Sequence, residues 1–317
     1  MDRMNELAFY TLGGAPRTPR ELIAEVQQAE AHAPPDGHSG LRHDDAQADR
    51  GALLTGLGPG HRADAQCLWA AAHHDGPDRG LRRSHAPRLA RRSRRRTRRT
   101  GWKYPLLTMG PQHHEHIPMT FTAFGPNSLA LGGRAFDAVV LHTFFTDETT
   151  ARCVAAVKRA AEQAGREPAA VRVWSCFATV GDHLPEDLRL KKFVGRMATY
   201  LQAYGDLMVQ TNRWDPAVLQ RFREDAFVAG FRGAIDALAT TEQLEHVATL
   251  IPDEWLAPAA TGSPEACVEK IRGQFDLGCD GVILHGATPA ELEPILAAYR
   301  KTRPAGRFDH LAANPAG

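Results

Sequence analysis

The sequence predicts an α/β protein whose best-fitting architecture is a TIM-type (β/α) barrel. Apolar, strand-like segments alternate with amphipathic helices along most of the 317 residues, and glycine turns or helix caps separate them. The alternation favours a parallel sheet with both faces covered, and the length suits one large barrel domain. One βα unit precedes residue 32, and four are visible after residue 100.

The first unit occupies residues 1–31. Residues 7–12 read as a strand that ends at two glycines. Thr18 then caps a helix that runs to Glu30, with Pro19 at the first helical position, where its fixed φ favours helix initiation.

The remaining units occupy residues 101–303. Their patterns predict strands at 119–124, 138–142, 171–180 and 281–286, and helices at 128–135, 149–164, 264–275 and 289–301. Two or three helices are expected over residues 185–250. This segment is longer than a connection between two strands requires, so we expect a helical insertion there. Residues 304–317 are expected to form a flexible tail.

Composition predicts an ordinary cytoplasmic protein. The net charge is +1, hydrophobic residues make up 43%, and no apolar run approaches the roughly 20 residues of a membrane span. The N-terminus lacks a signal-peptide pattern, so we expect no membrane association. The five cysteines are scattered and form no CxxC pair, which favours a reducing compartment over a disulfide framework or a zinc ribbon.

Residues 32–100 break this pattern. They contain no Val, Ile, Phe, Met, Tyr, Lys, Glu or Asn, and they carry 14 Arg against 7 Asp. The segment therefore holds a charge of +7 while the rest of the chain holds −6. Few residues of this Arg/Ala/Gly/His-rich segment can contribute to a hydrophobic core, so we expect the segment to be disordered or irregular.

Three interpretations of this segment remain open. The run at residues 88–99 is dense enough in arginine for a nucleic-acid-binding arm, which we consider the remotest of the three. The second is a disordered insertion. The third, which we favour, is that GC-rich DNA is read here in a shifted frame. A one-nucleotide shift over residues 36–61 permits an amphipathic helix, a glycine turn, an apolar strand and a loop reading LGLGRG.

Four motifs resemble the bacterial-luciferase-like oxidoreductases, and within them the actinobacterial branch that uses the deazaflavin coenzyme F420. The motifs are AFYTL at residues 8–12, AFGPN at 123–127 with ALGGRAFD at 130–137, TGSPE at 261–265, and GCDGVIL at 278–284. The shifted string LGLGRG resembles the glycine-rich loop after the family's fourth strand. The resemblance implies a (β/α)8 barrel of the luciferase type, with strands 2–4 damaged or missing.

The resemblance also implies a cofactor and its contacts. Hydride transfer at carbon 5 of a deazaflavin is expected, with a small organic molecule as substrate, FMN as the alternative cofactor and a homodimer as a possible assembly. The implied cofactor-binding residues are Tyr10, Ala123, Phe124, Gly125, Pro126, Asn127, Gly262 and Ser263. For the turn at 125–127, a helix N-terminus offers amide N–H groups to an anion, although a plain βα turn is the alternative. Gly262 and Ser263 also suit an ordinary helix cap.

Two histidines are the candidate catalytic residues. His142 and His285 each end a predicted strand, and ligands of a (β/α) barrel sit at the carboxyl ends of its strands. Either imidazole can hydrogen-bond the substrate or act as an acid, and each can equally be a histidine satisfied at a strand end. Cys176 has no base beside it in sequence and is expected in the core.

No metal site is expected. The histidines at 113, 114 and 116 are adjacent in one short loop without a partner at helical spacing, a pattern that favours an exposed loop. The alternative functions are an FMN-dependent monooxygenase of the same family, a non-catalytic remnant of it, and, remotely, a basic nucleic-acid-binding protein.

The shifted-frame hypothesis predicts a specific result at the level of DNA. Resequencing the gene should reveal compensating insertions or deletions that flank the codons of residues 32–100. Closely homologous genes that encode the same arginine-rich text in an intact frame would refute it.

Overall fold

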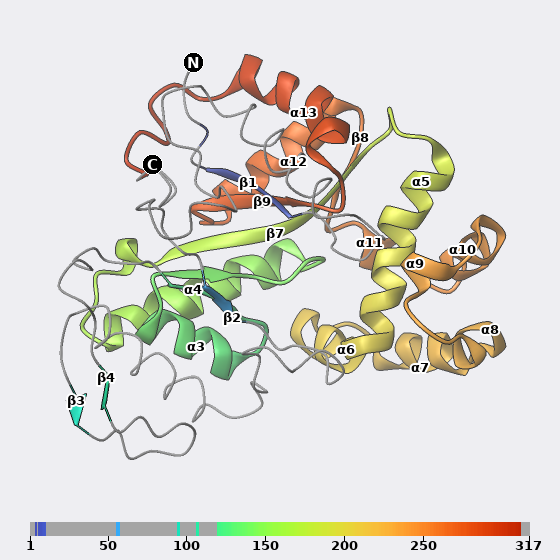
Figure 1. Cartoon of the computed structure of the whole chain (residues 1–317), viewed down its shortest axis with the longest axis horizontal. Helices are drawn as coiled ribbons and strands as arrows, with labels where there is room; N and C mark the ends of the chain where they lie inside the picture. The colour runs from blue at the N-terminus through green and yellow to red at the C-terminus, as the bar shows by residue number, and fades with distance from the viewer. Residues whose placement is uncertain are drawn as a thin grey trace. The chain divides into compact units, whose positions relative to one another are not determined.

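The fold was analysed in a computed structural model of the whole chain (Figure 1). The structure describes residues 119–311, together with residues 4 and 6–10 and three short strands. These strands are β2 (Thr55–Leu57), β3 (Arg94–Arg95) and β4 (Leu106–Leu107). Contacts divide the chain into two compact units: residues 1–37, 141–152 and 174–313 form the first, and residues 38–140, 153–173 and 314–317 form the second.

The first unit is built around parallel strands. β1 (Leu7–Tyr10) pairs with β9 (Gly281–His285), which pairs in turn with β7 (Arg172–Gly181). The short strand β8 (Ala260–Gly262) pairs with the last residues of β7. The first and last long strands of the chain therefore lie side by side, as closure of a (β/α) barrel requires.

Two helices cover one face of these strands. α12 (Pro264–Asp276) and α13 (Pro289–Thr302) pack on each other and on β9 (Figure 1). The apolar core between them includes Leu7, Phe177, Val282, Leu284, Ile271 and Leu296, all buried. Alternate residues of β9 thus face the helices, and the residues between them face the other side of the sheet.

The second unit holds a parallel trio of β2, β5 (Met119–Thr122) and β6 (Ala138–Val140). α3 (Pro126–Ala135) connects β5 to β6, and the second half of α4 (Asp147–Gln163) packs on α3. Gly133 permits this approach, because a Cβ there would collide with the carbonyl oxygen of Val157. β3 and β4 form a separate antiparallel pair.

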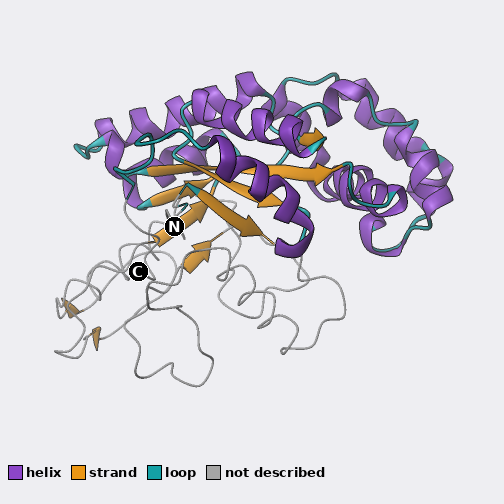
Figure 2. Cartoon of the chain, turned by 90° about the horizontal axis from the view of Figure 1, so that it is seen from above, coloured by secondary structure: helices purple, strands orange, loops and turns teal. Residues whose placement is uncertain are grey.

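The chain between β7 and β8 is helical (Figure 2, right of the view). It contains α5 (Glu186–Leu190), a π-helical turn η2 (Lys191–Gly195), α6 (Arg196–Asn212) and α7 (Pro216–Glu224). Four shorter helices follow: α8 (Ala226–Gly230), α9 (Ile235–Leu238), α10 (Thr241–Ala248) and α11 (Asp253–Leu256). The sequence predicted two or three helices, because short helices carry too few periodic positions to be resolved by pattern.

The predicted order of strands and helices is confirmed from residue 119 onward, and the bounds given for these strands and helices differ from the observed ones by at most two residues. β8 was not predicted, since three residues carry no alternation. The predicted helix at 18–30, residues 312–317 and, apart from β2 and β3, the segment 32–100 lie outside the described residues. Residues 304–311 belong to the predicted flexible tail, yet Phe308 is buried against Phe275 with ring centroids 4.8 Å apart.

A buried ion pair ties the beginning of the chain to its end. The Glu6 carboxylate is fully buried and accepts two hydrogen bonds from Arg303, at 2.7 and 3.0 Å. The Tyr299 hydroxyl donates a third at 3.1 Å. The backbone carbonyl of Glu6 accepts from the amide of Val282, so the same residue starts the pairing of β1 with β9.

Removal of the arginine should therefore destabilise the fold strongly. We expect Arg303→Met to lower the free energy of unfolding by about 3–5 kcal/mol, because it leaves the Glu6 carboxylate buried without its cation. Urea denaturation followed by circular dichroism measures this. The double variant Glu6→Gln/Arg303→Met should recover part of the loss, and a double variant as unstable as the sum of both single variants would contradict the account.

Candidate functional site

Both candidate histidines belong to the first unit, and each lies at or just after the carboxyl end of a strand. His285 is the last residue of β9, and His142 follows β6 by two residues. Val282 and Leu284 of β9 are buried in the core under α12 and α13, so Ile283 and His285 face the opposite side of the sheet.

A stripe of polar and aromatic side chains on the helical segment after β7 meets these histidines. Lys192, Arg196, Tyr200 and Tyr204 recur at every fourth position through η2 and α6. Positions four apart lie on the same face of a helix, which explains how one segment contributes four side chains. All four side chains are half-buried.

Each histidine is paired with a tyrosine of this stripe. The Tyr204 hydroxyl lies 3.2 Å from Nε2 of His142, and the Tyr200 hydroxyl lies 3.2 Å from Nε2 of His285. The two tyrosine rings stack with centroids 5.5 Å apart, and the His142 ring meets both edge-on, at 4.8 and 5.1 Å. The structure thus brings the two predicted residues into one cluster, which we call the His–Tyr cluster: His142, Tyr200, Tyr204 and His285.

The tautomer of His142 follows from its partners. Nδ1 lies 2.9 Å from the carbonyl oxygen of Thr143, which can only accept a hydrogen bond. Nδ1 therefore carries the proton when the imidazole is neutral. Nε2 is then an acceptor, and the Tyr204 hydroxyl donates to it.

Both imidazoles are neutral at physiological pH. Burial lowers the pKa of His142 to about 4, against a smaller raising effect of the Thr143 carbonyl. Burial is also the largest cause that lowers the pKa of His285 to about 3, with further contributions from Arg196, His142 and Lys192. Burial likewise raises the pKa of the Tyr200 hydroxyl well above its usual value, so this tyrosine stays protonated.

The two cations of the stripe have carboxylate partners. Arg196 forms an ion pair with the buried Asp236, and its guanidinium lies 5.6 Å from the centre of the Tyr200 ring. Lys192 forms an ion pair of 3.1 Å with Glu291 and donates to the carbonyl oxygen of Gly286 at 3.0 Å. These pairs fix the stripe beside β9 and keep the cluster close to neutral in charge.

Cys176 is a thiol rather than a nucleophile. The Thr143 hydroxyl donates to its sulfur at 3.2 Å, and burial raises the pKa of the thiol to about 11. Its side chain is half-buried in β7, opposite Ile283 in the register with β9. The sequence analysis expected Cys176 in the core, and the structure leaves it only half-buried, because it lies on the face of β7 that does not pack under α12 and α13; the raised pKa agrees with the absence of a reactive role.

The helix that carries the stripe is irregular where it meets the histidines. η2 is a π-helical turn, and Tyr204 has non-helical torsion angles (φ −150°, ψ 36°) that kink α6. Gly205 follows, where a Cβ would collide with Leu219 of α7. Such π turns and kinks occur often at functional sites, since they redirect side chains that a regular helix would carry past one another.

The predicted cofactor turn at residues 123–127 belongs to the second unit. Ala123 and Phe124 are buried, and α3 begins with Pro126 and Asn127. The Ser128 hydroxyl accepts the amide N–H groups of Phe124 and Gly125, at 3.0 and 3.1 Å. Of the amide donors expected for a phosphate at 125–127, that of Gly125 is therefore already used within the turn and Pro126 has no N–H, and the cofactor role of these residues stays a prediction.

The other predicted cofactor residues lie at strand ends of the first unit. Gly262 ends β8 with a φ of +101°, which favours glycine, and its carbonyl oxygen accepts from the amide of Asp182. Ser263 caps α12 by accepting from the amide of Ala266 at 3.2 Å. Tyr10 ends β1 in register with His285. Their cofactor role likewise stays a prediction.

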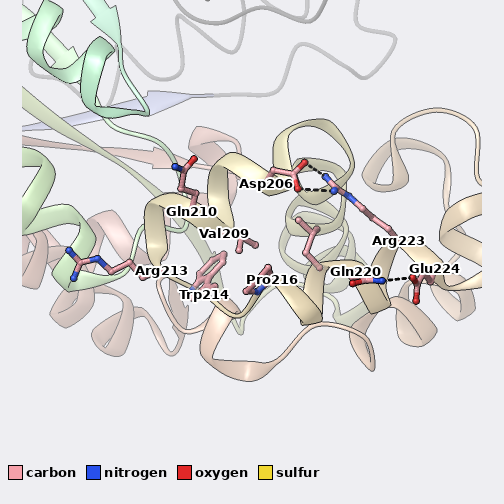
Figure 3. Close-up of a pocket in the computed structure, with 10 residues that line it drawn as sticks. Asp206, Val209, Gln210, Arg213, Trp214, Pro216, Gln220, Arg223 and Glu224 are labelled. Atoms are coloured by element: carbon pink, nitrogen blue, oxygen red, sulfur yellow. Dashed lines mark hydrogen bonds and ion pairs between the residues drawn. The ribbon is translucent and has the colours of Figure 1, made fainter.

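A separate open pocket lies between α6 and α7 (Figure 3). Its volume is about 750 Å³, and Trp214, Val209 and Pro216 line it beside charged residues. Arg223 forms a two-point ion pair with Asp206 at its edge, at 2.7 and 2.9 Å. None of the residues predicted from the sequence lines this pocket.

Two further properties concern the described part of the chain. There, no helix is long and apolar enough to cross a membrane. Histidine, cysteine and acidic side chains also do not gather in any group of three or more that could hold a metal ion, within the same residues. The histidines at 113–116 lie outside the described residues.

The sequence analysis found the two histidines and missed their partners. Tyr200, Tyr204, Arg196 and Lys192 were treated only as part of a helical insertion. Their four-residue spacing was the available signal, because it puts two cations and two phenols on one helix face. Without the structure, nothing indicated that this face meets the strand ends.

The fold and the cluster define a class of protein. Parallel strands alternate with helices, and buried and half-buried polar side chains meet at the strand ends, as in enzymes built on (β/α) barrels. The chain belongs to the family of luciferase-like monooxygenases, whose family profile matches residues 50–281. This is a family of oxidoreductases and monooxygenases with the luciferase-type TIM barrel, so the predicted family and fold class are confirmed.

One solved structure shows the same fold at low sequence identity, and two others have lower similarity scores. The coenzyme F420-dependent tetrahydromethanopterin reductase from Methanopyrus kandleri is 15% identical, with a TM-score of 0.59 over 77% of this chain and 72% of that chain. An F420-dependent secondary alcohol dehydrogenase is 11% identical, with a TM-score of 0.48 over 79% and 70%. Monooxygenase RslO1 from Streptomyces bottropensis is 15% identical, with a TM-score of 0.44 over 78% and 67%. No curated protein matches the sequence.

Because both histidines are neutral in the folded protein, we expect the protein to lose stability at acidic pH. A histidine whose folded pKa lies below the unfolded value of 6.5 binds its proton more readily in the unfolded chain. Stability conferred by neutral His285 is therefore complete above pH 6.5 and is lost as the pH falls toward the folded value. We expect the free energy of unfolding of the wild type to fall about 1.4 kcal/mol per pH unit more steeply than that of His285→Gln.

Urea denaturation at a series of pH values from 6.5 down to about 4 measures this difference in slope. His246→Gln is the matched control, because His246 is exposed and pairs with Asp225 on the surface. Parallel curves for the wild type and His285→Gln would show that His285 is not buried in its neutral form.

Proposed function

We propose that this protein is an F420-dependent oxidoreductase that transfers a hydride between the deazaflavin and a small organic substrate. One observation carries the proposal: the His–Tyr cluster offers four polar side chains at strand ends, and its imidazoles and the Tyr200 hydroxyl are uncharged at physiological pH. Such a set can position a substrate and exchange one proton, and it cannot carry electrons by itself.

The donor set fits a deazaflavin and its substrate. The half-buried rings of Tyr200 and Tyr204 offer flat aromatic surface, and their hydroxyls offer hydrogen bonds to an uncharged polar group. Thiol Cys176 and two neutral imidazoles supply no strong nucleophile that would attack the substrate. When bound, a deazaflavin supplies hydride chemistry, and the protein supplies orientation and a dry environment.

The residues of the cluster have distinct proposed roles. Nε2 of His142 accepts from the Tyr204 hydroxyl, so the proton of a substrate hydroxyl would pass to the Tyr204 oxygen while Tyr204 gives its own proton to Nε2, as the substrate carbon gives up its hydride. In the reverse direction the same pair would return that proton to the oxygen of a carbonyl. Tyr204 shares this proton through its hydrogen bond to Nε2, and His285 with Tyr200 would hold the substrate from the side of β9.

The choice of F420 rests on the sequence motifs, with support from the fold. Two of the structurally similar proteins are F420-dependent, a reductase and an alcohol dehydrogenase. The proposed contacts of the cofactor are Tyr10, Gly262 and Ser263 at strand ends of the first unit, and residues 123–127 in the second. FMN is the alternative cofactor, and with it a monooxygenase reaction would replace hydride exchange.

The setting of the reaction is part of the proposal. No disulfide joins the described cysteines at 153, 176, 267 and 279 to one another, which suits the reducing environment of the cytoplasm. The expected partner is a small molecule, and a homodimer is the expected assembly. A nucleic-acid role would rest on the arginine run at 88–99, most of which lies outside the described residues.

A substrate panel tests the proposal. Purified protein is mixed with oxidised F420 and small secondary alcohols, or with reduced F420 and the matching ketones, and the absorbance of the oxidised cofactor is followed. We expect turnover with at least one pair. His142→Gln should lower kcat by about 10²- to 10⁴-fold, the usual contribution of a positioned acid–base group, with the affinity for F420 retained.

His246→Gln serves as the matched control and should turn over like the wild type, because this histidine lies on the surface of the helical insertion. Turnover that His142→Gln leaves intact would remove His142 from the reaction. Turnover with reduced FMN and oxygen in place of F420 would favour the monooxygenase alternative.

A further inference from the structure

Two cations lie beside the His–Tyr cluster, and the proposed reaction does not use them. Lys192 and Arg196 precede Tyr200 by eight and four residues on the same helix face. Nζ of Lys192 lies 3.0 Å from the carbonyl oxygen of Gly286, the residue that follows His285. The guanidinium of Arg196 lies 5.6 Å from the centre of the Tyr200 ring, whose hydroxyl lies 3.2 Å from Nε2 of His285. We call Lys192 and Arg196 the cationic pair.

The charge of the cationic pair acts on the cluster. Burial is the largest cause of the low pKa of His285, and Arg196 and Lys192 lower it further. Burial raises the pKa values of Tyr200 and Cys176, and Arg196 opposes the rise in both. A positive charge that disfavours a proton on His285 favours a negatively charged group at the same place. The electrostatics of this end of the site therefore suit an anion.

The carboxylate partners hold the cationic pair and leave part of it available. Lys192 donates to Glu291 and to the Gly286 carbonyl, so one of its three N–H donors has no partner within the described part of the chain. Asp236 contacts Nη2 of Arg196, whose Nε also has no hydrogen-bond partner among the described residues. The side chains of the pair keep 16% and 13% of their surface exposed. Because positions four apart on a helix lie about 5–6 Å apart at Cβ, one oxyanion can contact both cations.

We propose that the cationic pair binds an anionic group of the substrate, a carboxylate or a phosphate, while the His–Tyr cluster acts at the substrate's uncharged hydroxyl or carbonyl group. The substrate is thus a small alcohol or carbonyl compound that also carries a negative charge. This assignment rests on the proposed function, because only the reaction defines a substrate. The anion site itself is a property of the cofactor-free protein, so it can be tested without turnover.

Nuclear magnetic resonance of the cofactor-free protein with ¹⁵N-labelled histidine tests the anion site through a signal next to it. The resonances of His285 are assigned by their loss in His285→Gln. Inorganic phosphate, and separately acetate, is then added at constant ionic strength. We expect a saturable shift of the His285 resonances, because an anion bound by the cationic pair changes the electric field at this ring. Resonances of His285 that neither anion moves would overturn the proposal.

Two variants of one ion pair should change the phosphate affinity in opposite directions. Lys192→Met removes a cation and should weaken binding about 10- to 100-fold, the contribution of a hydrogen bond to a charged group. Glu291→Gln removes the competing carboxylate and should strengthen binding about 2- to 5-fold, the scale of a partly exposed ion pair. Glutamine can keep the capping box with Thr288, so α13 is retained.

The opposite signs separate binding from stability. A merely structural role of this ion pair would make both variants bind phosphate more weakly, and that result would overturn the proposal. The test stands on Glu291→Gln alone where Lys192→Met does not fold, since unchanged or weaker binding in Glu291→Gln contradicts an anion next to Lys192.

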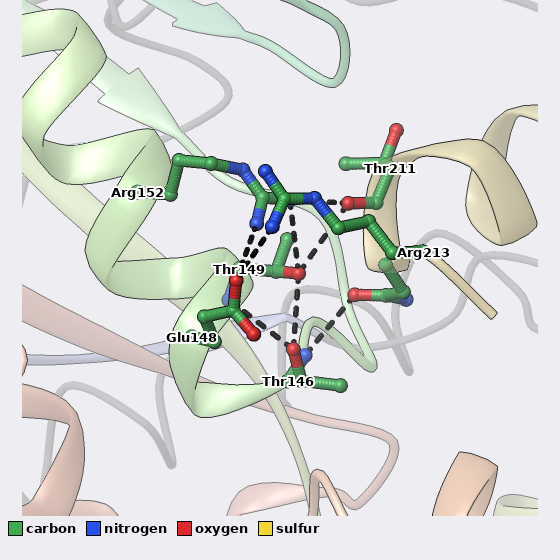
Figure 4. A network of polar contacts seen from close by, with 7 residues as sticks. Thr146, Glu148, Thr149, Arg152, Thr211 and Arg213 are labelled. Atoms are coloured by element: carbon green, nitrogen blue, oxygen red, sulfur yellow. Dashed lines mark hydrogen bonds and ion pairs between the residues drawn. The ribbon is translucent and has the colours of Figure 1, made fainter.

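Glu148→Gln is the matched control. Glu148 pairs with Arg213, which follows the last residue of α6, and with Arg152 of α4 (Figure 4). The variant therefore removes a carboxylate from an ion pair at the opposite end of α6 from Arg196. The phosphate affinity measured at His285 should equal that of the wild type. A gain equal to that of Glu291→Gln would show that loss of any carboxylate strengthens binding, which contradicts a site at the cationic pair.

Steady-state kinetics with F420 assign the anion to the substrate. The substrates are a hydroxy acid, a phosphorylated alcohol and an uncharged secondary alcohol of similar size. In Lys192→Met we expect the KM of the preferred anionic substrate to rise about 10- to 100-fold, with the KM of the uncharged alcohol and the affinity for F420 unchanged. A lower affinity for F420 would assign the anion to the cofactor's phosphate and would overturn the substrate assignment.

Failure of the proposed function gives a different result. Absence of turnover with every substrate, in a protein whose His285 resonances still respond to phosphate, would refute the proposed reaction and with it the substrate assignment, while the anion site would stand.

Discussion

The position of two imidazoles at the strand ends, His285 buried and His142 half-buried, is the constraint on which the rest of the site depends. A ring nitrogen withdrawn from water needs a hydrogen-bond partner, and Nε2 of each histidine finds one on α6. α6 must therefore keep a fixed position across the strand ends, so that its tyrosines stay within hydrogen-bond distance of the histidines. The ion pair of Arg196 with Asp236, the ion pair of Lys192 with Glu291 and the side chain of Asn212 hold it there.

This arrangement joins the stability of the fold to the chemistry of the site. β9 supplies His285 on one face, while its other face packs under α12 and α13. Its neighbour β1 is secured by the buried Glu6 and Arg303, which link the two ends of the chain. The cluster thus lies on the sheet in which β1 and β9 pair. Weaker pairing of these two strands would therefore change the position of His285, the last residue of β9.

Most of the strands and helices that have a local sequence pattern could be predicted from the sequence. Strands with clear apolar runs and helices with caps, such as that at Ser263, were found near their observed bounds. Tyr200 and Tyr204 were not assigned to the site, because contact between α6 and the strand ends is a tertiary feature. Phe308 was predicted to lie in a flexible tail, since a single aromatic residue forms no periodic pattern that would indicate a buried segment. The segment 32–100 was expected to be irregular, yet residues 55–57 form β2, which pairs with β5 in parallel.

The central claim is that this chain holds a deazaflavin beside the His–Tyr cluster. Titration of the purified full-length protein with F420, and in parallel with FMN, tests it most directly through the fluorescence of each cofactor. The account predicts saturable binding of F420 that is tighter than binding of FMN. A protein that keeps its helical circular dichroism and binds neither cofactor would contradict it, and one that prefers FMN would support a monooxygenase instead.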